Sequence, residues 1–262
     1  MKRAFHSTHC SREGKRVGLT WEKARSVFLS DLHLGWQLSN PEAALEFLNV
    51  CDPRYVYLVG DTFEGFHRSL DLRSSTALRL WSALRNLAAR GTEVVVLTGN
   101  HDCALAGMCD ETPFRATAHA VHTNLQGERF LVTHGDIFDY LDASAGTFTK
   151  EFGSWIYPWL VRSGDLLQLL GFLPKAQRGI WCEYWKRGLR EARAHIEAFE
   201  QSMVELAQHY ECDGVICGHI HRPDRKRLND RWYINCGDWV EHHSLVLETY
   251  DGQMLLVSDL WT

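Results

Sequence analysis

Five short apolar runs, each followed by polar or charged residues, are spread along the chain. They cover residues 26–31, 55–61, 93–100, 129–136 and 214–219. Apolar runs of this length are typical of strands that are buried on both faces. Two stretches with helical periodicity, residues 41–50 and 75–90, separate the first three runs, and the second ends at Gly91, a residue that commonly stops helices. This alternation predicts an α/β fold with parallel central strands.

The pattern changes in the second half of the chain. Residues 140–210 are rich in Trp, Tyr and helix-forming residues, which predicts a helical insertion or lid within a main domain of residues 26–262. Residues 231–239, 243–252 and 253–259 alternate apolar and polar positions, which predicts antiparallel strands. Residues 1–25 carry an excess of basic side chains and predict a flexible arm. The expected architecture is a mixed β-sandwich flanked by helices.

Composition narrows the classes of function. The 262 residues carry a net charge of -5, which argues against a broad nucleic-acid-binding surface, so no nucleic-acid partner is expected. Eight cysteines without a C-x-x-C pair indicate cytosolic thiols rather than a disulfide framework. No apolar stretch has the length of a signal peptide or a membrane span. The predicted location is cytoplasmic, with a peripheral contact at the inner membrane face as an alternative.

Metal-type side chains follow all five apolar runs. They are Asp31 and His33, then Asp61, then Asn100 with His101 and Asp102, then His134, and finally His219 and His221. Ligands at the carboxyl ends of parallel strands converge on one crevice. In D-x-H and H-x-H, alternate residues of an extended chain face the same side, so we expect both side chains to enter the site. Oxygen and imidazole donors in this number suit two divalent ions that share a carboxylate, with Mn²⁺, Mg²⁺, Fe or Zn²⁺ favoured over soft metals.

Together, these motifs resemble the calcineurin-like metallophosphoesterase family. SDLHLG, VGDTFEG, TGNHD, VTHGD and CGHIHRP match its D-x-H, GD, GNH, lone-His and GH-x-H boxes, and the resemblance spans about residues 26–260. It implies a four-layer α/β sandwich of two mixed β-sheets flanked by helices. It also implies a metal-dependent hydrolase of phosphoric esters or diphosphates, with Mn²⁺ as the expected metal.

The resemblance further implies a role for each motif residue. One ion would be held by Asp31, His33, Asp61 and His221, and the other by Asp61, Asn100, His134 and His219. A hydroxide bridging the two ions would attack phosphorus. His101 would protonate the leaving oxygen or steady the transition state, and Asp102 would orient the ring of His101.

Within the family, VGDTFEG, GHIHRP and INCGDWVEHHSLVLE are similar to the branch of UDP-2,3-diacylglucosamine pyrophosphatases of lipid A synthesis. Glu64 agrees with that branch, whereas His101 departs from it, because its best-known members have Arg there. The implied reaction converts UDP-2,3-diacylglucosamine to UMP and 2,3-diacylglucosamine 1-phosphate. The expected partner is therefore a phosphorylated small molecule or lipid.

Three residues are candidate substrate contacts, namely Asp142 after the fourth run and Lys186 and Arg190 in the insertion. The apolar segment 155–172 lies before these basic residues, and such a combination suits an acylated phosphate. It is equally typical of a helix that packs on its own core. Other functions also remain open: a nuclease or other phosphodiesterase, a phosphatase, and a non-catalytic binding scaffold. The acidic net charge disfavours the nuclease, and a scaffold would be expected to lack ligands, whereas none is missing.

Overall fold

The computed structural model describes residues 7–8, 18–19, 24–34, 39–63, 75–100, 102, 112–137 and 178–258, and for residues 178–192 only the backbone. Contacts between residues divide the chain into two compact units. The first contains residues 1–136 and 203–262, and the second contains residues 137–202. The arm and insertion predicted from the sequence stay predictions, since 138–177 and most of 1–23 lie outside the described residues.

A six-stranded mixed sheet holds three of the five predicted strands. Its order is β13-β12-β3-β4-β5-β6, with β3 (Ala24–Leu29), β4 (Tyr55–Val59), β5 (Glu93–Leu97), β6 (Arg115–Thr117), β12 (Leu245–Thr249) and β13 (Met254–Val257). Strands β3 to β6 are parallel, whereas β12 pairs antiparallel with both β3 and β13. The parallel pairing of β3, β4 and β5 confirms the predicted central strands.

The other two predicted strands belong to a five-stranded mixed sheet. Its order is β10-β11-β9-β8-β7, with β7 (His119–Thr123), β8 (Arg129–Thr133), β9 (Gly214–Cys217), β10 (Asp224–Leu228) and β11 (Arg231–Asn235). Strands β8, β9 and β11 are parallel, and antiparallel β7 and β10 form the edges. A separate short pair joins β1 (Ser7–Thr8) to β2 (Gly18–Leu19).

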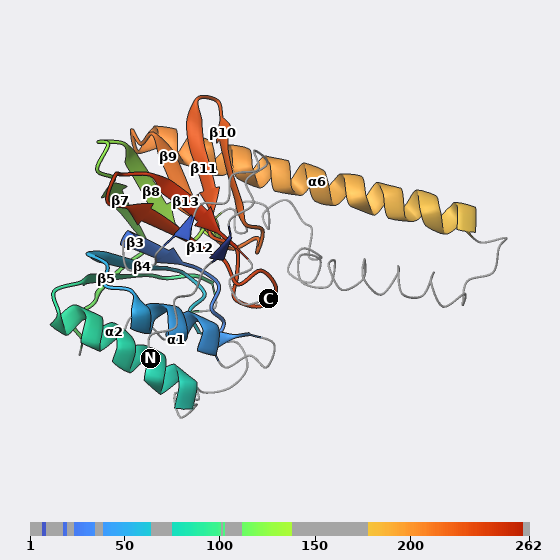
Figure 1. Ribbon diagram of the computed structural model, residues 1–262. Helices are drawn as coiled ribbons and strands as arrows, with labels where there is room; N and C mark the ends of the chain where they lie inside the picture. Colours follow the sequence, from blue (N-terminus) through green and yellow to red (C-terminus); the bar gives the residue numbers. More distant parts are fainter. Residues whose placement is uncertain are drawn as a thin grey trace. The chain divides into compact units, whose positions relative to one another are not determined.

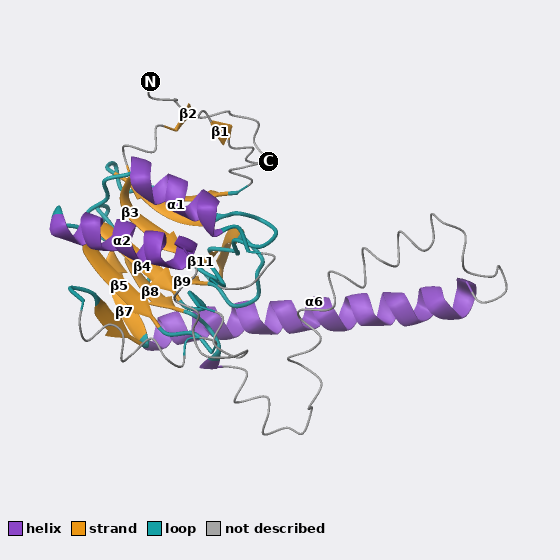
Figure 2. Ribbon diagram, turned by 90° about the horizontal axis from the view of Figure 1, so that it is seen from below, coloured by secondary structure: helices purple, strands orange, loops and turns teal. Residues whose placement is uncertain are grey.

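Two helices cover the outer face of the six-stranded sheet, as Figures 1 and 2 show. Helix α1 (Pro41–Val50) starts at Asn40, whose Oδ1 accepts a hydrogen bond from Ala43 N, and Pro41 occupies the first turn, where its missing N–H costs nothing. Helix α2 (Ser75–Ala89) is followed by Gly91, whose φ of 100° is the left-handed conformation that ends many helices. A third helix, α6 (Arg178–His209), spans 32 residues, and its last turns belong to the first unit.

Two hydrophobic clusters hold these layers together. One lies between α1, α2 and the six-stranded sheet and includes Phe47, Leu84 and Val96. The other lies between the two sheets and includes Phe28 and Ile234. Two mixed sheets with flanking helices confirm the predicted fold class.

One strand assignment from the sequence is wrong. Residues 231–239 were expected to pair antiparallel with the closing strands, but β11 lies in the other sheet, parallel to β9. The reason is its burial, because Tyr233 and Ile234 are both fully buried on opposite faces, as in a central strand. Only 245–249 and 254–257 form the predicted antiparallel pair.

Candidate metal centre

The carboxyl ends of β3 and β9 bring together a first three-residue cluster, Asp31, His33 and His221. One potential ligand atom from each lies within 4.8 Å of the other two. His33 Nε2 is 3.1 Å from His221 Nε2, and Asp31 Oδ1 is 3.1 Å from His221 Nε2. Asp31 and His33 are fully buried, while 24% of the His221 side chain is exposed. Two imidazoles and a carboxylate at this spacing can ligate a single divalent ion.

A second cluster is formed by Asp61 after β4, His134 after β8 and His219 after β9. His134 Nε2 is 3.3 Å from Asp61 Oδ2, and the rings of His134 and His219 are 5.1 Å apart. His134 is fully buried and its Nδ1 lies 2.9 Å from the carbonyl oxygen of Val59. Asn100 comes after β5 at the same edge and is half-buried. The structure thus gathers six of the predicted ligands into two groups of three, each of which could hold a metal ion.

The backbone at the site is left-handed rather than extended. Five candidate ligands have positive φ: Asp31 (54°), His33 (42°), Asp61 (49°), His219 (71°) and His221 (51°). The expectation that D-x-H and H-x-H would bring their side chains together along an extended chain is therefore wrong. Tight turns at the strand ends orient these side chains instead. Such conformations are uncommon for residues with a side chain and cluster at functional sites.

Backbone hydrogen bonds join the loops that carry the clusters. His33 N donates to Asp61 O over 2.9 Å, and Gly218 N donates to His134 O over 3.1 Å. Two glycines in these loops leave no room for a side chain. A Cβ at Gly60 would collide with the His134 ring, and one at Gly218 would collide with Ser30 Oγ and Asp31 Oδ2. The ligands are therefore held by close backbone packing as well as by their own strands.

Asp102 links two of these loops through hydrogen bonds. Its carboxylate accepts hydrogen bonds from the backbone N–H of Gly99 (3.1 Å), Thr62 (3.2 Å) and Phe63 (2.9 Å). Burial, helped by the nearby charge of Asp61, raises the pKa of Asp102 to about 6, even though the three N–H groups favour the ionised form. His101 lies outside the described residues, so the predicted orientation of its ring by Asp102 stays a prediction.

The protein residues fit a pair of cations. Within the described part of the chain, the buried atoms Asp31 Oδ1 and His134 Nε2 make no hydrogen bond of good geometry, although each lies close to a ligand atom of its own cluster. Such atoms are costly unless a ligand contacts them. Burial alone would lower the pKa of His134, yet the neighbouring Asp61 carboxylate raises it well above its usual value. The carboxylates of the site thus stabilise positive charge on the neighbouring imidazole. When the imidazoles lose their protons to bind metal, the divalent ions supply this positive charge instead.

Two residues that were not predicted from the sequence lie beside the candidate ligands: Ser30 contacts Asp31, and Asp238 lies close enough to His221 for their charges to interact. Ser30 Oγ lies 2.5 Å from Asp31 Oδ2 and 2.8 Å from Val59 O, so it fixes the Asp31 carboxylate against β4. Asp238 is fully buried, accepts hydrogen bonds from Val240 N and Glu241 N, and pairs with His242 Nδ1 at 2.6 Å. The sequence offered a signal for each: Ser30 directly precedes Asp31 in SDLH, and Asp238 in GDW lies a few residues before His242.

The predicted substrate contacts are not placed by the structure. Asp142 lies outside the described residues, as does the apolar segment 155–172. Lys186 and Arg190 lie in α6, in the part for which only the backbone is described. All three residues stay predictions.

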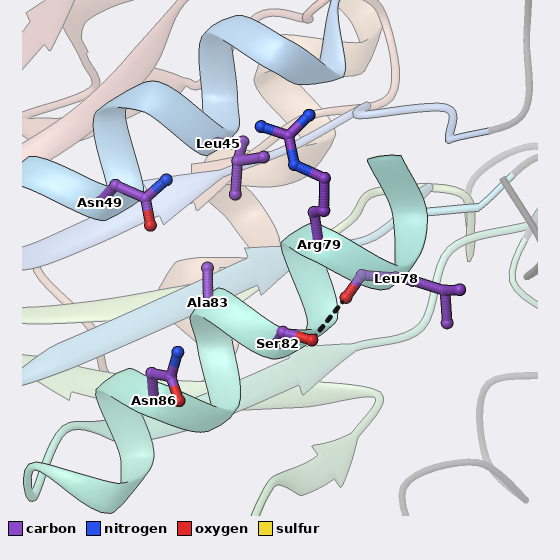
Figure 3. A pocket seen from close by; sticks show the side chains of 7 residues that line it. All are labelled: Leu45, Asn49, Leu78, Arg79, Ser82, Ala83 and Asn86. Atoms are coloured by element: carbon purple, nitrogen blue, oxygen red, sulfur yellow. Dashed lines mark hydrogen bonds between the residues drawn. The ribbon is translucent and has the colours of Figure 1, made fainter. Parts of the chain in front are cut away.

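A shallow groove of about 290 Å³ lies between α1 and α2, on the helical layer rather than at the strand ends (Figure 3). Its lining includes Leu45, Asn49, Leu78 and Ser82, and the Ser82 hydroxyl donates to Leu78 O within α2. Arg79, also in the lining, pairs with Glu42 at 2.9 Å. The groove brings no group of catalytic or metal-binding side chains together, so the strand ends remain the candidate site.

Residues 24–223 match the family model of the calcineurin-like phosphoesterases. The chain belongs to this family. It is accordingly a metal-dependent phosphoester hydrolase, and the family implies divalent metal ions, for which the two clusters are the candidate sites. The predicted resemblance is confirmed.

Curated relatives of this calcineurin-like phosphoesterase carry a more specific name. A UDP-2,3-diacylglucosamine hydrolase of Shewanella pealeana is 26% identical over 88% of this chain and 97% of its own length. A protein of the same name from Hahella chejuensis is 28% identical over 88% of this chain and 96% of its own length. Among solved structures, an archaeal phosphodiesterase is similar, with 13% identity, a TM-score of 0.42, and coverage of 89% of this chain and 98% of that one.

None of the described helices is both long enough and apolar enough to cross a membrane.

Proposed function

We propose that this phosphoesterase holds two divalent ions, with Mn²⁺ as the resident metal, and hydrolyses UDP-2,3-diacylglucosamine to UMP and 2,3-diacylglucosamine 1-phosphate. The observation that carries the proposal is the presence of two His/Asp clusters. Each contains a buried potential ligand atom, Asp31 Oδ1 or His134 Nε2, that makes no hydrogen bond of good geometry within the described residues. The names of the relatives support the choice of a diphosphate substrate.

Each residue of the site has a distinct role in the proposed reaction. Asp31, His33 and His221 would hold one ion, His134 and His219 with Asn100 the other, and Asp61 would be shared. Bound divalent ions supply Lewis-acid neutralisation of phosphoryl charge and lower the pKa of water. Asp102 and Ser30 keep the ligand loops in place. His101, beside Asn100 in the sequence, would donate a proton to the leaving oxygen.

The decisive experiment compares two substrates on the Mn²⁺-loaded protein. We expect release of UMP from UDP-2,3-diacylglucosamine at a kcat/KM at least about a hundredfold above that for bis-p-nitrophenyl phosphate. Replacing His101 by Ala should lower the first value by about 10²- to 10⁴-fold, the usual contribution of a general acid. His119→Ala is the matched control, because His119 is an exposed histidine on β7. Hydrolysis of the generic diester alone would reject the lipid substrate while retaining the metal chemistry.

A further inference from the structure

Part of the candidate metal centre is exposed to solvent. Asp31, His33 and His134 are fully buried, whereas His219 and His221 are partly exposed. Asn100, which follows β5, is also partly exposed. His219 and His221 belong to the loop between β9 and β10, so this loop borders the exposed part of the site. A substrate that reaches the metals on this side would lie next to the loop.

Arg222 is the next residue of that loop and its side chain is exposed. Within the described part of the chain, its guanidinium has no hydrogen bond, ion pair or ring contact. Its neighbours on the following hairpin differ, because Arg225 and Arg227 each lie 4.3 Å from the centre of the Trp232 ring. Arg227 also lies 3.7 Å from Glu128. Arg222 is therefore a cation beside the exposed part of the site, and no carboxylate of the described residues pairs with it.

The backbone beneath Arg222 is held in place. Pro223 restricts the residue before it to extended conformations. The Pro223 ring packs on Gly237, where an added Cβ would lie 2.9 Å from Pro223 Cβ and 3.0 Å from its Cδ. Gly237 precedes Asp238, which is anchored by backbone N–H groups. Arg222 thus projects from a rigid support, which lowers the entropy lost when a ligand orders its side chain.

We propose that Arg222 binds the phosphoryl group of a diphosphate substrate that is not attacked. The inference rests on the proposed function and deepens it, because a monophosphate ester has no such second group. A guanidinium offers a planar, permanently charged pair of donors that matches two phosphoryl oxygens. Arg222 would therefore make the site prefer diphosphates over single phosphoryl groups.

Calorimetry on the full-length, Mn²⁺-loaded protein tests this preference with two non-reacting probes, methylenediphosphonate and inorganic phosphate. Arg222→Gln should weaken methylenediphosphonate binding at least about tenfold, the usual loss for a charge-assisted hydrogen bond, and phosphate binding by less than about threefold. Arg222→Lys should give an intermediate loss, since it keeps the charge but not the paired donors. Arg227→Gln, an exposed arginine of the same hairpin, should leave both affinities unchanged.

Equal weakening of both probes, no weakening of either, or an equal effect of Arg227→Gln would overturn the assignment. Neither probe needs to be hydrolysed. Failure of the protein to cleave UDP-2,3-diacylglucosamine would therefore reject the proposed substrate, while the two calorimetric series would still decide the role of Arg222.

Discussion

His134 Nδ1 donates a hydrogen bond to the carbonyl oxygen of Val59 over 2.9 Å. Because a carbonyl only accepts, the proton of the neutral ring must sit on Nδ1, which leaves the Nε2 lone pair directed at Asp61 and the metal centre. The strand that precedes Asp61 thus sets the tautomer of a ligand that comes from the other sheet.

Removal of this imidazole should empty one metal position. For His134→Ala we expect the Mn²⁺ content, measured by elemental analysis after gel filtration, to fall from about two ions to about one per chain. Hydrolysis of bis-p-nitrophenyl phosphate should fall at least about a hundredfold. His119→Ala, which replaces an exposed histidine, should keep both values. A fully metallated, active His134→Ala protein would exclude His134 as a ligand.

Gly60 and Gly127 offer a matched test of close packing. Their φ values, 83° and 85°, are nearly the same, but a Cβ at Gly60 would collide with the His134 ring and one at Gly127 would touch nothing within 4 Å. Gly127→Ala should cost about 1–2 kcal/mol of unfolding free energy from its φ alone. Gly60→Ala should cost a further 1–3 kcal/mol or so from overpacking and should also reduce metal content. Urea denaturation of the metal-free proteins measures the difference, and similar losses for both variants would contradict the predicted collision.

Asp102 should stabilise the protein even without metal. In Asp102→Asn, the amide group places a donor where the carboxylate accepts from backbone N–H groups, so one of three hydrogen bonds is lost. We expect the unfolding free energy of the metal-free protein to fall by about 1–3 kcal/mol. A role limited to orienting His101 predicts an unchanged unfolding free energy and a changed pH profile of hydrolysis.

A buried ion pair far from the ligand loops should make stability depend on pH. Glu248 accepts hydrogen bonds from Arg25 (2.6 Å) and Ser26 (2.5 Å), and its Oε2 is 2.9 Å from His122 Nε2. Burial opposes ionisation of Glu248, but the hydrogen bonds of His122, Ser26 and Arg25 prevail and lower its pKa to about 2. The stabilisation is therefore complete above the ordinary pKa of about 4.5 and is lost as the pH falls towards 2.

The variant Glu248→Gln isolates this effect. It should be less stable than the wild type by about 3 kcal/mol at pH 6, and the gap should narrow as the pH is lowered below about 4.5. Urea denaturation of the metal-free proteins at several pH values measures it. A gap that stays constant down to pH 3 would show that the ionisation of Glu248 is not what stabilises the network.

The sequence predicted most of the central strands and the positions of the metal-type residues, because buried strands are long apolar runs and their ends are marked by polar motifs. It missed β10, whose sequence DRKRL has none of the apolar alternation of a strand and which forms a sheet edge. It also missed β7, where alternate residues such as Val121 are exposed. Short edge strands owe their conformation to a neighbour rather than to their own pattern.

The buried network around Glu248 also went unpredicted, although a signal existed. Alternation along β12 places Leu245 and Leu247 in the cluster against the helices and Val246 in the cluster between the sheets. Glu248 has the same parity as Val246, so it had to face the interior between the sheets. What the sequence could not supply was its partner, because His122 comes from the other sheet, 126 residues earlier.

The left-handed turns that carry Asp31, Asp61 and the GH-x-H histidines bear on how such a centre can change over evolution. Asp, Asn and His are the residues with side chains that tolerate positive φ best, and they are also common ligands of divalent ions. Selection for the turn and selection for the metal therefore favour the same few residue types at each position. Substitutions that preserve the turn are thus largely confined to residues that can also bind a metal.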